Sequence, residues 1–99
     1  MSLSARAWTL PDEVLVRCTH SGLNELIEFA GAAGMQMVGS VDPYDDTRFN
    51  QMQMRLVIPE LLKLTEIAPE RAADAARELI PIAELVSAGA HRYLEFIGD

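Results

Sequence analysis

The chain has 99 residues and a formal net charge of −7, from 15 acidic and 8 basic residues. This length fits one domain, residues 1–99, and 49% apolar residues are typical of a globular chain rather than a disordered one. Phosphate backbones are bound by clustered Lys and Arg, whereas Lys63 is the single lysine and the arginines are scattered. We therefore expect no nucleic-acid binding, while a negative field favours a basic partner.

The compartment is predicted from what the chain lacks. Cys18 is the single cysteine, so no internal disulfide can form. The apolar runs are shorter than the roughly 20 residues that span a bilayer, and no signal-peptide pattern opens the chain. We expect a cytoplasmic protein without membrane contact. Residues 1–3 are left out of the fold argument.

The first half of the chain indicates two strands and a helix. Residues 4–11 read as an irregular lead-in, with Trp8 packed against the body. Residues 13–18 are rich in β-branched side chains and predict a strand. Ser21 is placed to cap a helix that begins near residue 22 and ends at the glycines 31 and 34. The alternating residues 35–38 predict a second strand.

The second half indicates two long helices and a closing strand. Thr47 is the expected N-cap of an amphipathic helix, and Pro59 inside it predicts either a kink or a break. Pro69 opens the next helix, which has an alanine-rich face and contains Pro81. Residues 92–97 then predict a strand.

Together these elements predict an α+β fold. About three helices pack on a small two- or three-stranded sheet, formed by short strands near residues 13–18, 35–38 and 92–97. We expect the two terminal strands, 13–18 and 92–97, to lie side by side.

The acidic turn at residues 42–46 is the leading candidate site. Asp42, Tyr44, Asp45 and Asp46 are the predicted partner-binding residues, with the carboxylates as an anionic contact and Tyr44 as an aromatic anchor. Three carboxylates could also begin a shell for calcium or magnesium, but the glycine and distant glutamate of a calcium-binding loop are missing. A turn that also caps the following helix is the preferred structural interpretation.

Three weaker candidates have a structural explanation that we prefer. Cys18, His20 and His91 are ligand types for zinc, and also a nucleophile with bases, but their spacing favours a buried cysteine and two unrelated histidines. Four methionines bracket the turn and could line a groove, although core gap-filling is favoured; they are Met35, Met37, Met52 and Met54. The aromatic strand at 92–97 could be an exposed edge that recruits another chain, although internal pairing is favoured.

Two segments carry a resemblance. Residues 46–54 and 91–99 resemble the D-T-x-F-N-x-x-Q-M and H-x-Y-L-x-F-I-G-D segments of small bacterial proteins of uncharacterised function. The two segments cover under a fifth of the chain. The resemblance implies no activity, cofactor or catalytic residue, and it favours a bacterial accessory or partner-binding protein over an enzyme.

The predicted function is a non-enzymatic protein-binding module, such as an immunity- or antitoxin-like inhibitor of a basic partner. The alternative is a small-ligand or divalent-metal-binding protein, which could be an enzyme, built on the same turn. A homo-dimer through the terminal strand or the alanine-rich helix face is compatible with both. No resident cofactor and no catalytic residue is predicted.

Overall fold

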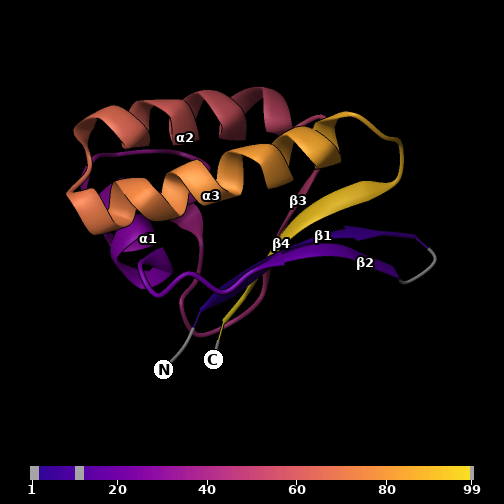
Figure 1. The fold of residues 1–99 in the computed structure, drawn as a ribbon, viewed down its shortest axis with the longest axis horizontal. Coiled ribbons are helices and arrows are strands. Elements are labelled where there is room, and N and C mark those ends of the chain that lie inside the picture. Colours follow the sequence, from indigo (N-terminus) through magenta and orange to yellow (C-terminus); the bar gives the residue numbers. More distant parts are fainter. Residues whose placement is uncertain (1–2, 11–12, 99) are drawn as a thin grey trace.

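The computed structural model describes residues 3–10 and 13–98. Met1, Ser2, Pro11, Asp12 and Asp99 lie outside it, so the end of the predicted lead-in at residue 11 and the last residue of the segment 91–99 are not described. Within the described residues, three α-helices pack on one face of a four-stranded antiparallel sheet, which confirms the α+β class (Figure 1). The sheet has four strands where two or three were expected.

The strands are β1 (Ser4–Thr9), β2 (Glu13–Cys18), β3 (Thr47–Asn50) and β4 (Arg92–Ile97), and their order across the sheet is β2-β1-β4-β3. The helices are α1 (Leu23–Ala32), α2 (Met54–Ile67) and α3 (Glu70–Ser87), with a short 3₁₀ turn, η1 (Val38–Ser40). No helix in the described part of the chain combines the length and the apolar character that crossing a bilayer requires.

Residues Ser4–Thr9 form strand β1, so the predicted irregular lead-in is wrong. Ala5 pairs with Cys18 of β2 on one side and with Phe96 of β4 on the other. β1 therefore separates the two strands that were expected to be neighbours. Its alanines, serine and arginine have little intrinsic strand preference, but Ala5 and Ala7 are buried beneath the helices. The burial of these two side chains, rather than the intrinsic strand preference of the segment, therefore explains why β1 is a strand.

The predicted strand at residues 35–38 is also wrong. The carboxylate of Glu60 on α2 accepts hydrogen bonds from the backbone N–H groups of Met37, at 3.1 Å, and Val38, at 2.8 Å. These bonds hold the segment as a loop that leads into η1, with the Val38 side chain buried. The alternation of apolar and polar side chains at residues 35–38 therefore accompanies the burial of one side chain, Val38, and does not indicate a strand.

The helix expected from Thr47 begins instead at Met54, because residues 47–50 form strand β3. Phe49 pairs with Leu94 of β4 and is buried. The turn into α2 is closed by Asn50 and Gln53: the Asn50 side chain accepts from the Gln53 N–H at 2.9 Å, and the Gln53 side chain accepts from the Asn50 N–H at 2.8 Å. This reciprocal pair has the hydrogen-bond pattern of a capping box, formed across the turn that precedes α2, and it was not predicted from the sequence.

Helices α2 and α3 run without a break through Pro59 and Pro81. Both prolines are exposed, so the hydrogen bond that each ring removes lies on the solvent side of its helix. Of the two alternatives for Pro59, a broken helix is therefore wrong.

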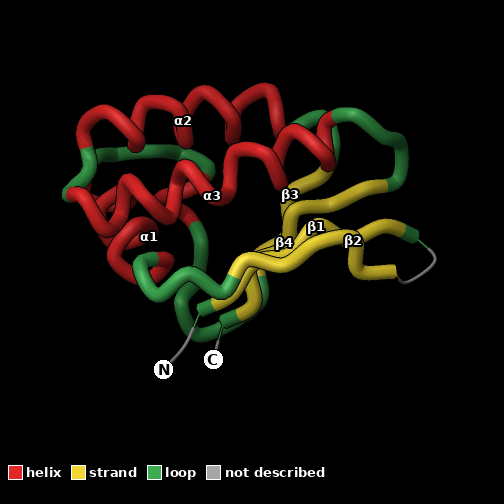
Figure 2. Tube along the Cα trace, viewed as in Figure 1, coloured by secondary structure: helices red, strands yellow, loops and turns green. Residues whose placement is uncertain are grey.

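Helix α3 lies between α2 and α1 and packs on the sheet (Figures 1 and 2). Its inward face consists of small and aliphatic side chains, all buried: Ala72, Ala73, Ala75, Ala76, Leu79, Ile82, Ala83 and Val86. The alanines allow the neighbouring helices to approach closely, and they confirm the slim face expected for this segment. Because this face is internal, it is not available as a dimer surface.

The sheet face away from the helices is organised around a buried carboxylate. Glu95 of β4 is the one buried charged side chain in the described part of the chain. It lies 2.6 Å from Arg6 of β1 and 3.1 Å from Arg48 of β3. The Arg48 guanidinium also stacks over the ring of Trp8, 4.6 Å from its centroid. Ionic and cation–π contacts therefore link the three strands β1, β4 and β3.

Replacing Glu95 with alanine is expected to destabilise the fold by about 2 kcal/mol, because both arginines lose their counter-ion. The value is below that for a fully buried pair, since the Arg6 and Arg48 side chains are 24% and 47% exposed. Urea unfolding measures the change. Glu84→Ala on the exposed face of α3 is the control and is expected to stay within about 0.5 kcal/mol of the parent. Equal stability of the two variants would contradict a stabilising role for the contacts of Glu95 with Arg6 and Arg48.

Candidate functional site

The acidic turn lies between η1 and β3 and is closed by its own side chains. The Asp42 carboxylate accepts from the Tyr44 N–H at 2.8 Å, and the Thr47 hydroxyl accepts from the Asp42 N–H at 3.0 Å. The Asp45 carboxylate accepts from the Asp46 N–H at 2.8 Å. The turn chemistry predicted for this segment is present, but Thr47 closes the turn and does not cap a helix.

The end of β4 fixes the turn to the body of the protein. A Cβ atom at Gly98 would lie 2.3 Å from both the backbone N and the backbone O of Asp45. Backbone therefore packs directly on backbone, at a distance that no other residue at position 98 would allow. Gly98 directly follows the predicted strand at 92–97, but its contact with Asp45 depends on the tertiary arrangement.

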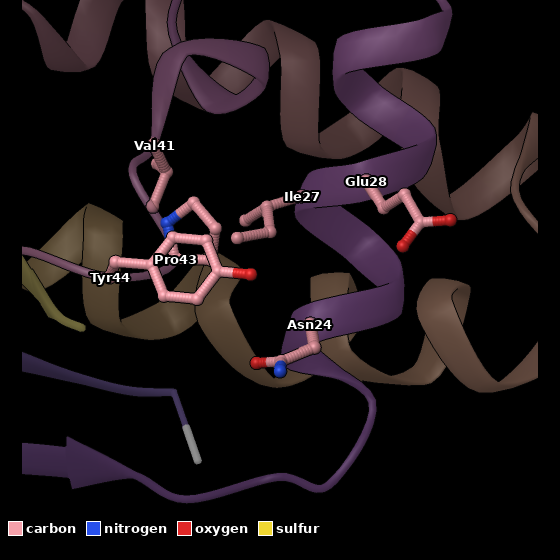
Figure 3. A pocket seen from close by; sticks show the side chains of 6 residues that line it. All are labelled: Asn24, Ile27, Glu28, Val41, Pro43 and Tyr44. Atoms are coloured by element: carbon pink, nitrogen blue, oxygen red, sulfur yellow. The ribbon is translucent and has the colours of Figure 1, made fainter. Parts of the chain in front are cut away.

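A shallow hollow opens between the turn and α1. Its volume is about 230 Å³, and it is lined by Asn24, Ile27, Glu28, Val41, Pro43 and Tyr44 (Figure 3). Ile27 and Val41 are buried, whereas Tyr44 is 68% exposed. In Figure 3 the Tyr44 ring stands at the edge of the hollow with its hydroxyl directed towards α1. The hollow thus joins an apolar base to a rim with a phenol, an amide and a carboxylate.

The turn beside the hollow is negatively charged. Asp42, Asp45 and Asp46 are exposed, and none of them forms an ion pair with another described residue. Glu28 stands on the α1 side of the hollow and also borders a second hollow of about 330 Å³ further along that helix. Of the four predicted site residues, Tyr44 lines the hollow that α1 borders, and the three aspartates lie next to it in the turn. The contribution of α1 to the hollow was not predicted.

The carboxylates of the turn are engaged with backbone rather than gathered around one point. Asp42 and Asp45 each use an oxygen to accept an N–H of the turn itself. Within residues 3–10 and 13–98, no three His, Cys, Asp or Glu side chains come together as metal ligands would.

Cys18, His20 and His91 are not brought together. Cys18 lies opposite Ala5, whereas the His91 carbonyl accepts from the Leu10 N–H at the other end of β1. Five positions at about 3.3 Å each separate these ends by roughly 16 Å. The His20 ring nitrogen accepts from the Gly22 N–H at 2.8 Å and so supports the start of α1, the task predicted for Ser21.

The methionines and the C-terminal strand also have structural roles. Met54 is buried, Met35 and Met37 are half-buried, and Met52 is exposed. β4 lies between β1 and β3, so the alternative in which it forms an exposed edge is wrong. The edges of the sheet are β2 and β3.

No protein-family model, curated protein or solved structure matches this chain.

Cys18 is expected to be inert in the folded protein. Burial raises the pKa of its thiol to about 11, and the nearby Glu78 carboxylate adds to the effect. At pH 8 the reactive thiolate is then a minute fraction. A thiol-specific disulfide reagent should leave the native protein unmodified and react at once after unfolding in urea. Modification of the native protein at the rate of the unfolded chain would contradict this assignment.

Proposed function

We propose that the protein is a non-enzymatic binding module that docks a basic protein surface on the acidic turn. The observation that supports this proposal most strongly is that three exposed aspartates, which form no ion pair with another described residue, flank an exposed tyrosine that lines an apolar hollow. Negative charge steers a basic partner, and an aromatic side chain beside a hollow is suited to anchor it. The proposal includes a bacterial, cytoplasmic setting.

Preorganisation supports the same function. The turn is held by three short hydrogen bonds to its own side chains and by the backbone contact at Gly98. Because the turn is already held in one conformation, a partner that binds it incurs no entropic cost for ordering it. Tyr44 and Glu28 line the hollow, and the three exposed aspartates flank Tyr44 in the same turn, so a partner anchored on Tyr44 would also meet the charges of the turn.

An inhibitor of the immunity or antitoxin type is the concrete form of this proposal. Such a protein covers a cationic active site and needs a fixed anionic surface with a central anchor. In this form the aspartates match the basic groups of the partner, and Tyr44 enters its cleft.

The test compares three baits in affinity capture from a native bacterial lysate. They are the parent chain, a turn variant with Tyr44→Ala, Asp45→Asn and Asp46→Asn, and a control with Glu70→Gln and Glu84→Gln. The control also removes two negative charges, but from exposed positions on α3. A stoichiometric basic protein should bind the parent and the control, elute as salt rises, and be lost by the turn variant.

Purified partner then allows the kinetics to be measured. Neutralising Asp45 and Asp46 should lower the association rate at low salt by roughly tenfold, while Tyr44→Ala should mainly raise the dissociation rate. Capture of the same partner by the turn variant and the parent would remove the turn from the interface. An acidic or neutral partner would contradict the charge argument.

A further inference from the structure

Helix α2 carries apolar side chains on two opposite faces, and the outward face also carries Arg55, Lys63 and Glu66. Its inward face packs in the core with Met54, Val57, Leu61 and Leu64. Its outward face carries Leu56, Leu62 and Ile67, which are 56%, 50% and 43% exposed, together with the exposed Pro59. In Figure 1 α2 is the outermost layer, and no other element of the described chain covers it.

The other two helices do not share this property. α3 exposes mainly charged side chains, namely Glu70, Arg71, Asp74, Arg77, Glu78 and Glu84. α1 exposes Glu25 and Glu28. The solvent side of a surface helix is normally polar, whereas four of the exposed side chains of α2 are apolar. The outward face of α2 therefore has the character of a protein contact.

We propose that this face is a homodimer interface, in which α2 packs antiparallel against α2 of a second copy across a two-fold axis. The proposal goes beyond the binding of a basic partner and uses a different surface, since the acidic turn lies outside α2.

The arrangement of side chains on α2 fits a two-fold axis. Arg55, Leu62 and Glu66 follow one another at i, i+7 and i+11 and define one flank of the face. Leu56, Lys63 and Ile67 repeat the same spacing one position later and define the other flank. Pro59 lies between the two flanks.

An antiparallel two-fold brings each flank against the same flank of the second copy. With the crossing point between residues 60 and 61, Arg55 is level with Glu66 of the second copy, and Leu62 is level with its Pro59. On the other flank, Leu56 is offset from Ile67 of the second copy by two residues, about 3 Å along the axis, which these side chains can span. Each ion pair and each apolar contact then occurs twice.

Charge also favours a second copy at this face. The chain carries −7 overall, so two copies repel one another through most of their surfaces. The outward face of α2 carries Arg55, Lys63 and Glu66, with Glu60 at its margin bound to backbone N–H groups. This face is thus close to neutral, and its charges are arranged to complement themselves.

Sedimentation equilibrium of the full chain over micromolar to millimolar concentrations tests the proposal. The parent should show a reversible rise from the 10.9 kDa monomer to twice that mass. Arg55→Glu should raise the dimer dissociation constant by at least roughly tenfold, because two ion pairs become two repulsions. Glu66→Arg should raise the dissociation constant to a similar extent. The double variant Arg55→Glu, Glu66→Arg should restore dimerisation, because it reverses both charges of each ion pair.

Leu62→Glu should abolish the dimer, and Glu84→Arg on the exposed face of α3 is the control that should leave it unchanged. Circular dichroism checks that each variant remains folded. A parent chain that stays monomeric at every concentration would overturn the proposal and leave the face to a different protein. The antiparallel α2 arrangement would be overturned if the double variant Arg55→Glu, Glu66→Arg failed to dimerise. It would also be overturned if the Leu62→Glu variant still formed a dimer.

Discussion

The alanine face of α3 is the constraint on which the structure depends. A chain of 99 residues can build one core, and here that core lies between a sheet and three helices. Ala72, Ala75, Ala76 and Ala83 are fully buried in the middle of it. Their small side chains let α3 contact α1, α2 and the sheet at once. A larger side chain at any of these positions would force one of those neighbours away.

Both proposed surfaces follow from this central helix. α1 packs against α3 and forms one wall of the hollow beside the acidic turn, whose other wall is fixed by Gly98. α2 packs against α3 with one apolar face and therefore presents its second apolar face to the outside. The two surfaces are separate, so a dimer through α2 would carry two copies of the turn. A partner with more than one basic site would then bind with increased avidity.

The sequence predicted the elements whose patterns are local. The strands at 13–18 and 92–97 and all three helices were predicted from β-branched runs, helical spacing and breakers. What failed was decided by tertiary contacts: β1 is a strand because Ala5 and Ala7 fill the space beneath the helices, and residues 35–38 are a loop because Glu60 binds their N–H groups. Thr47 had the residue type of an N-cap, but Asn50 and Gln53 close the turn into α2. The four residues of the candidate site were chosen from the sequence, whereas the hollow and the Gly98 contact needed the fold.

The most direct test of the central claim is the stability of Ala76→Leu, measured by urea unfolding beside Ala32→Leu at the exposed end of α1. If the alanine face sets the distance between the helices, the added volume at Ala76 should destabilise the protein by about 1–3 kcal/mol, and the control should be close to neutral. Equal stability of the two variants would contradict the account, because it would mean that the packing around α3 has room to spare.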